Sequence, residues 1–202
     1  PPGVNLLAVS KMQPASAIRE LAVCGQLDFG ESRVQEALPK QEALSDLTDL
    51  RWHFIGRLQA NKVRAVVRAF SWIHSIDSMA LAERSSRIAV EEGCYPSVLF
   101  QVKLRSDPSK GGWDPESLKE AWPVLRQLPG LNVAGLMTMA PLGLNIPERQ
   151  DLFRACRNLA DELDLAQCSM GMSGDWPQAA AAGATWVRVG SALFGERPSV
   201  TP

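Results

Sequence analysis

Residues 6–30 read LLAVSKMQPASAIRELAVCGQLDFG, and this stretch contains the repeating unit of the fold. A short apolar run is followed by a segment in which apolar residues recur at helical spacing, and then by a second short apolar run. Pro14 stands where the helix is expected to begin, and Gly25 stands where it is expected to end. The stretch therefore predicts a strand, a helix and a second strand parallel to the first.

The same alternation continues along the rest of the chain. Strands are predicted at residues 6–10, 27–30, 52–56, 72–76, 98–102, 133–137, 168–172 and 186–190. Helical spacing marks residues 14–23, 78–92 and 147–163. Because these strands are apolar on both faces, we expect a parallel sheet covered by helices. About eight such units predict an α/β fold, a single (β/α)8 TIM barrel, with an open doubly wound sheet as the structural rival.

Composition and charge narrow the classes of function. Of the 202 residues, 46% are hydrophobic and 21% are charged, which is typical of a globular domain. The formal net charge is −1, so we expect neither nucleic acid nor an anionic membrane as the main partner. No apolar run approaches the ~20 residues of a membrane span. No linker-like stretch divides the chain, so we expect one domain over residues 1–202.

The cysteines favour a cytoplasmic protein, and the N-terminus bears on how much of the chain is present. The four cysteines form no CxxC pair, and with only two histidines in the chain we expect no metal site. We interpret the cysteines as small buried hydrophobic residues in a reducing compartment. The sequence opens Pro-Pro-Gly rather than with Met, and no signal-peptide pattern follows. We therefore expect that a preceding segment is missing.

Two cationic residues fall where a barrel of this kind gathers its chemistry, at the C-terminal ends of the strands. Lys11 follows the first strand, and alternation places it on the same face as Leu7 and Val9. A lysine in that place either reacts with a carbonyl as a neutral amine or is a solvated end-of-strand charge. Arg188 lies within the last strand, where it serves either a structural ion pair or a ligand heteroatom.

Two Ser/Gly stretches resemble an anion cradle. Residues 172–177 leave the seventh strand and residues 190–195 leave the eighth, and each leads into a predicted helix. Free backbone N–H groups before a helix attract anions, and the loops after strands 7 and 8 are the usual phosphate site of a TIM barrel. Taken singly, either stretch could be ordinary helix capping. A carbonyl-reactive lysine, a phosphate cradle and a buried arginine together suggest pyridoxal 5′-phosphate.

Longer motifs carry a resemblance to a known family. The segments concerned are LAVSK (7–11), FGES (29–32), WHFIGRLQANK (52–62), HSID (74–77), GLMTM (135–139), SMGMSGDWPQA (169–179) and VRVGSALFG (187–195). Over essentially the whole chain the sequence resembles the pyridoxal phosphate homeostasis protein family. The HFIG-x-LQ-x-NK and GMS-x-D motifs are specific to that family.

The resemblance implies a barrel similar to that of alanine racemase, the type III fold of pyridoxal-phosphate proteins. It implies a set of six cofactor-binding residues, namely Lys11, Ser173, Gly174, Arg188, Gly190 and Ser191. In this set the lysine forms a Schiff base with the cofactor and the arginine faces the pyridine nitrogen. The serines and glycines contact the phosphate. A cation beside the pyridine nitrogen disfavours its protonation and weakens the ring as an electron sink.

Several polar residues leave their roles open. Ser32 departs from the family pattern, in which Asn is frequent after Gly-Glu, so a contact from that side chain is in doubt. His53 and His74 lie within strands and are interpreted as hydrogen-bonded core residues. Lys62 either caps a helix at the barrel mouth or lines the pocket. Lys110, in a glycine-rich loop, is interpreted as a solvated charge, with a secondary cofactor contact as the alternative.

The sequence favours a carrier over an enzyme. Racemisation on this barrel needs a second acid or base opposite the lysine, and the only tyrosine, Tyr95, precedes the fifth strand at the far end. The chain also ends soon after Arg188, which leaves no room for a second domain. We therefore expect a monomeric, non-catalytic protein that carries and buffers pyridoxal 5′-phosphate on Lys11.

The family resemblance places such a carrier in vitamin B6 homeostasis and amino-acid and keto-acid balance, with apo-enzymes or regulatory proteins as possible recipients. Two alternatives stay open at this point. One is a pyridoxal-phosphate enzyme of the same fold type, a small racemase or decarboxylase. The other is an aldolase in which Lys11 attacks a sugar phosphate directly.

Overall fold

The computed structural model describes residues 3–107 and 110–195, in which strands and helices alternate along the chain. The strands are β1 (Asn5–Val9), β2 (Asp28–Glu31), β3 (Arg51–Phe54), β4 (Trp72–Ile76), β5 (Ser97–Gln101), β6 (Asn132–Met137), β7 (Gln167–Met172) and β8 (Trp186–Val189). The helices are α1 (Ala15–Val23), α2 (Val34–Ala43), α3 (Val63–Ala69), α4 (Met79–Glu92), α5 (Pro115–Leu125), α6 (Ile146–Glu162), α7 (Trp176–Ala181) and α8 (Ser191–Phe194), with a 3₁₀ turn η1 (Ala60–Lys62) before α3.

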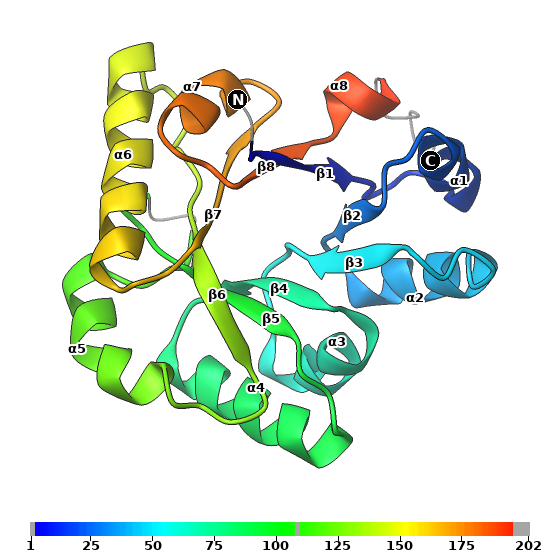
Figure 1. Cartoon of the computed structure of the whole chain (residues 1–202), viewed down its shortest axis with the longest axis horizontal. Helices are drawn as coiled ribbons and strands as arrows, with labels where there is room; N and C mark the ends of the chain where they lie inside the picture. The colour runs from blue at the N-terminus through cyan, green and yellow to red at the C-terminus, as the bar shows by residue number, and fades with distance from the viewer. Residues whose placement is uncertain (1–2, 108–109, 196–202) are drawn as a thin grey trace.

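The strands form a closed barrel in chain order, and every neighbouring pair is parallel. β1 pairs with β8, in the register Leu7 opposite Arg188, and this pairing closes the barrel. Figure 1 shows the strands at the centre with the helices around them. The predicted (β/α)8 barrel is therefore confirmed, and the doubly wound alternative is excluded because an open sheet has no pairing between its first and last strands.

Proline and glycine begin and end the helices as the sequence predicts. Pro115 is the first residue of α5, where its missing N–H costs no hydrogen bond. Gly93 ends α4 with a φ of 63°, a left-handed conformation that glycine adopts without steric cost. At α6, Asn145 and Glu148 form a capping box that the proline pattern did not reveal. The α2 helix was also not predicted, and it contains an internal proline, Pro39.

The two faces of the barrel wall bury different kinds of side chain. Outward-facing residues such as Phe54, Phe100 and Leu136 pack against the helices in the main hydrophobic core. The interior, in contrast, holds the buried polar side chains of His53 and His74. The expectation that the strands are apolar on both faces is thus correct for the outside and wrong for part of the inside.

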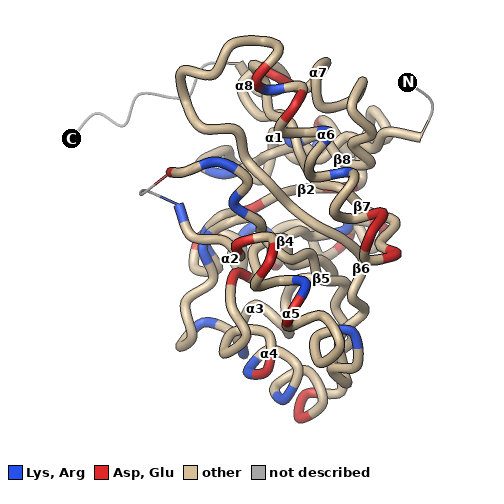
Figure 2. Tube along the Cα trace, turned by 90° about the vertical axis from the view of Figure 1, so that its left-hand side faces the viewer, with Lys and Arg blue, Asp and Glu red and all other residues tan. Residues whose placement is uncertain are grey.

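Charged residues lie mainly on the outer surface. Lys and Arg are interspersed with Asp and Glu over the helices and loops, as Figure 2 shows. Within the described residues, no helix combines the length and the hydrophobicity that crossing a membrane requires.

Candidate functional site

A cavity of about 320 Å³ opens at the C-terminal ends of the strands. Its lining residues are Val9, Lys11, Gln13, Ser32, Ile55, Met139, Met172, Ser173, Gly174, Arg188, Gly190, Ser191 and Gly195. All six residues that the resemblance implied as cofactor contacts belong to this one lining, although they come from both ends of the chain. The barrel closure between β1 and β8 brings them together.

Lys11 enters the cavity from the turn after β1. Its ammonium group has no hydrogen bond or ion pair to any other residue in the described part of the chain, and its neighbour Met12 has a φ of 63°. A left-handed conformation at a methionine costs roughly 1–3 kcal/mol and persists only where surrounding contacts enforce it. Contacts from other residues must therefore hold the turn that carries Lys11 in this conformation.

A buried ionic cluster of Glu31, Glu36 and Lys40 provides these contacts. Lys40 Nζ lies 2.9 Å from the carbonyl oxygen of Ser10, 2.9 Å from Glu31 Oε1 and 2.9 Å from Glu36 Oε1. Ser10 Oγ donates to Glu31 at 2.7 Å, and the amide of Met12 donates to Glu36. The residues before and after the lysine are thus both fixed. Burial raises the pKa of Glu31, although Ser10 and Lys40 oppose this effect.

Sequence reasoning did not find this cluster. Glu31 lies in the FGES motif, but its side chain points outward from β2 to Lys40 on α2, a helix that the apolar periodicity does not predict. The four-residue spacing of Glu36 and Lys40 is the signal that was available, because i and i+4 residues share a helical face.

Arg188 lines the same cavity from β8, the strand that pairs with β1. It is only 5% exposed, yet no carboxylate lies within ion-pairing distance of it in residues 3–107 and 110–195. Its Nη1 donates to Ser169 Oγ at 2.7 Å, and its Nη2 donates to the carbonyl oxygen of Thr138 at 2.9 Å. Desolvation lowers the pKa of Arg188 to about 10, so it stays charged at neutral pH. Within the described residues, therefore, Arg188 makes no structural ion pair.

The loop after β7 presents Ser173 and Gly174. Asp175 is buried at the start of α7, and its Oδ1 accepts the amide of Met172 at 2.6 Å. The amide of Gly190, at the start of α8, donates to Ser173 Oγ at 3.4 Å, so the two Ser/Gly stretches are in contact. They form one polar corner of the cavity.

An apolar wall completes the cavity, and sequence reasoning had not predicted it. Ile55 and Met139 follow β3 and β6, Met172 is the last residue of β7, and all three line the cavity beside Lys11 and the largely buried Gln13. Strand alternation and the order of strand ends were the available signals for Ile55 and Met139. Such a wall suits the flat face of an aromatic ligand.

The residues with open roles fall in different places. Ser32 lines the cavity. A Cβ at Gly56 would lie 2.0 Å from the carbonyl oxygen of Ser32, so the HFIG motif requires glycine where the two loops touch. Lys62 ends the 3₁₀ turn and is not part of the lining. Lys110 lies 3.5 Å from Asp107 in a small adjoining pocket that shares Met139 with the main cavity.

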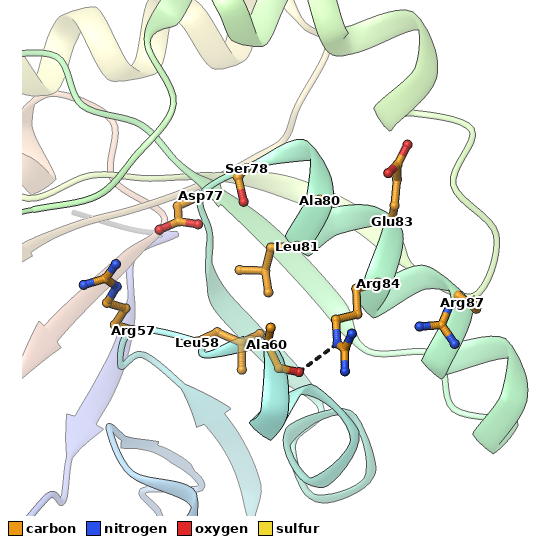
Figure 3. A pocket seen from close by; sticks show the side chains of 10 residues that line it. All are labelled: Arg57, Leu58, Ala60, Asp77, Ser78, Ala80, Leu81, Glu83, Arg84 and Arg87. Atoms are coloured by element: carbon orange, nitrogen blue, oxygen red, sulfur yellow. Dashed lines mark hydrogen bonds between the residues drawn. The ribbon is translucent and has the colours of Figure 1, made fainter.

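A larger cleft of about 570 Å³ lies beside the mouth, between the loop after β3 and α4 (Figure 3). Its arginines are exposed, and two of them are already engaged: Arg84 with the carbonyl oxygen of Ala60, and Arg87 with Glu91. It contains none of the six predicted contact residues. We therefore place the candidate site at the barrel mouth.

Ionisable groups are sparse in the candidate site. Among the described lining residues, Lys11 and Arg188 are the only ionisable ones. Tyr95 precedes β5 at the opposite end of the barrel and is 75% exposed, as the sequence order predicts.

Comparisons with known proteins agree with this geometry. The family model described as "Alanine racemase, N-terminal domain" matches residues 1–198. A pyridoxal phosphate homeostasis protein of Synechocystis sp. is 49% identical over 203 residues, covering 98% of this chain and 93% of the relative. The chain belongs to the pyridoxal phosphate homeostasis protein family. The resemblance seen in its motifs is confirmed.

Solved structures of other proteins share the barrel fold of this chain. The structure of PipY from Synechococcus elongatus with pyridoxal phosphate bound is 54% identical, has a TM-score of 0.93, and covers 96% of this chain and 94% of that one. Alanine racemase of Clostridium difficile has a TM-score of 0.80 at 16% identity, covering 99% of this chain and 57% of that one. The second likeness shows the fold alone, and it confirms the predicted similarity to the racemase barrel.

Proposed function

We propose that this protein binds pyridoxal 5′-phosphate at the barrel mouth, through a Schiff base on Lys11, and carries and buffers it without catalysis. The observation that carries the proposal is the pair of cations, Lys11 and Arg188, that face one cavity with no carboxylate at ion-pairing distance in the part of the chain that the structure describes. A buried cation without a counter-ion is costly, and an anionic or acceptor ligand offsets that cost. The bound cofactor in PipY supports the same conclusion.

The donor set fits the chemistry of the cofactor. Ser173, Gly174, Gly190 and Ser191 supply hydroxyl and backbone N–H groups suited to a phosphate. Arg188, which donates only, would face the pyridine nitrogen of the bound cofactor, and the apolar wall would cover the ring. When bound, the cofactor supplies an aldehyde that reacts with amines.

The shortage of acids and bases supports a carrier. Abstracting a Cα proton needs a base within reach of the substrate, and besides Lys11 the described lining offers only an arginine that stays charged. Tyr95 lies at the other end of the barrel. The homeostasis names of the relatives agree with a role in cofactor supply. Control of the free cofactor concentration, and through it amino-acid and keto-acid balance, follows from such a role.

Exchange of the Cα proton of alanine tests the absence of catalysis. In deuterated water, with protein and cofactor at stoichiometric concentration, we expect NMR to show exchange far slower than about 1 per second, a low value for an enzyme. Free cofactor at the same concentration serves as the control. Exchange at enzymatic rates would instead identify a racemase or decarboxylase of the same fold.

The proposal extends to the state of the protein in the cell. We propose a single-domain monomer in the cytoplasm that hands the cofactor to apo-enzymes or regulatory proteins. Light scattering is expected to give the mass of one chain across a hundredfold dilution, because the apolar faces of the long helices already pack against the barrel. A dimer that persists on dilution would contradict the monomer.

A further inference from the structure

A continuous line of buried polar side chains crosses the barrel interior and ends at the cavity. Its buried members, from the base of the barrel to the mouth, are Asp28, His53, His74, Ser169 and Arg188, and the half-exposed Arg51 pairs with Asp28 at the base. Each contact along the line is between 2.5 and 3.0 Å. Isolated buried polar groups are expensive, but a fully connected chain of hydrogen bonds is rigid.

The line begins with an ion pair at the base. Asp28 and Arg51 are the first residues of β2 and β3, the ends opposite the mouth. Arg51 Nε and Nη2 hold the two carboxylate oxygens of Asp28 at 2.6 and 2.5 Å. Hydrogen bonds from His53 and Arg51 lower the pKa of Asp28 against the effect of desolvation. Asp28 is therefore ionised at neutral pH, and it can only accept hydrogen bonds.

That carboxylate fixes the proton positions on both histidines. His53 Nε2 lies 3.0 Å from Asp28 Oδ1, so this nitrogen must carry the proton. Burial lowers the pKa of His53 and of His74, so both rings are neutral. Nδ1 of His53 therefore has no proton and accepts from His74 Nε2 at 3.0 Å. Two stacked or tilted indole rings, Trp72 and Trp186, enclose the His53 ring and exclude water.

The same logic continues to the cavity. Because His74 carries its proton on Nε2, its Nδ1 is an acceptor, and Ser169 Oγ donates to it at 2.9 Å. The oxygen of Ser169 is then free to accept from Arg188 Nη1 at 2.7 Å. Every bond runs in one direction, from Arg188 at the mouth to Asp28 at the base. Since one end only donates and the other only accepts, no link can reverse alone.

We propose that this relay is the positioning device for Arg188, with Ser169 and His74 as its positioning residues. The inference rests on the proposed function, in which Arg188 faces the cofactor ring. Nη1 is bonded to Ser169 Oγ and Nη2 to the carbonyl oxygen of Thr138, so the guanidinium keeps one orientation. Its remaining N–H groups therefore point in fixed directions. A carboxylate partner would hold the arginine equally well but would cancel the charge that the ligand meets.

Histidine NMR on the cofactor-free protein gives the first test. The chain contains only two histidines, so ¹⁵N-labelled, untagged protein gives two ring systems that His53→Gln assigns. At pH 7.5 we expect both rings to be neutral with the proton on Nε2. A proton on Nδ1 of His74 would overturn the relay, because Ser169 then has no acceptor there.

Removing the Ser169 hydroxyl gives the second test, with the cofactor bound. Ser169→Ala is expected to weaken pyridoxal-phosphate binding about tenfold and to shift the visible absorbance band, since a charged donor loses its acceptor. Ser75→Ala is the matched control. Ser75 is also buried, and its hydroxyl has no hydrogen-bond partner among the residues that the structure describes, so affinity and absorbance should stay unchanged. Ser169→Thr, which keeps a hydroxyl, should restore both.

The outcomes separate the relay from the proposed function. Equal behaviour of Ser169→Ala and Ser75→Ala, with normal cofactor binding, would refute the positioning role and leave the carrier intact. Failure of the unmodified protein to bind the cofactor would refute the carrier, while the tautomers, measured without cofactor, still decide the direction of the relay. Should Ser169→Ala not fold, the tautomers and Ser169→Thr provide the decision.

Discussion

Lys11→Ala is expected to abolish covalent attachment of pyridoxal 5′-phosphate while leaving the fold unchanged. Lys11 is the only lysine that lines the described cavity, and its ammonium group has no partner to lose within residues 3–107 and 110–195. The turn keeps its shape because Ser10 and Met12 are held through their own atoms. The effect on the free energy of unfolding should stay within about 0.5 kcal/mol, as for substitutions that break no contact.

Borohydride reduction followed by peptide mapping measures the attachment. The unmodified protein should show the reduced adduct on Lys11, and the variant should show no specific adduct. Lys62→Ala is the matched control, because Lys62 lies outside the cavity lining and its loss should leave the adduct in place. An adduct on Lys62 or Lys110 in the unmodified protein would show that the assignment of Lys11 is wrong.

The barrel and the site lining could be predicted from sequence because both follow from order along the chain. Parallel strands all end at the same face, so residues that follow a strand, such as Lys11 and Ser173, meet at the mouth whatever the details of packing. The strand boundaries in the structure differ from the predicted ones by at most two residues, because the ends of strands and helices are less regular than their centres. The meeting of the two Ser/Gly stretches was predictable for the same reason, because they follow the neighbouring strands β7 and β8.

The supports of the site were not predictable, because they depend on which way a side chain points across two elements. Lys40 reads as an ordinary solvated helix charge until α2 is docked on β2. His53 and His74 were correctly interpreted as buried, hydrogen-bonded residues. Their mutual contact, however, depends on the stagger between β3 and β4, which periodicity does not reveal.

Lys40→Met is expected to lower the free energy of unfolding by about 3–5 kcal/mol at pH 7.5, the cost of leaving a buried charge without its partner. Lys40 is 9% exposed and Glu31 is fully buried, with Glu31 Oε2 already lacking a hydrogen bond. Methionine fills the same space, so lost charge rather than lost packing is tested. Urea denaturation measures the change. Lys119→Met is the control, because that lysine pairs with exposed glutamates and its loss should cost far less.

The pH dependence identifies Glu31 as the group that bears this cost. Burial already raises the pKa of Glu31, and removing Lys40 takes away a contact that lowers it, so the pKa rises further in the variant. Between the ordinary pKa of a glutamate and this raised value, the folded state binds the proton and the unfolded state does not. Folded stability therefore falls as pH rises through that interval.

The loss in free energy of unfolding caused by Lys40→Met should accordingly be smaller at pH 5 than at pH 7.5. Adding Glu31→Gln to the Lys40→Met chain should recover part of this loss at pH 7.5. A deficit that is equal at both pH values, and that Glu31→Gln leaves unchanged, would mean that Lys40 acts through packing alone and that Lys11 is not held by a charged cluster.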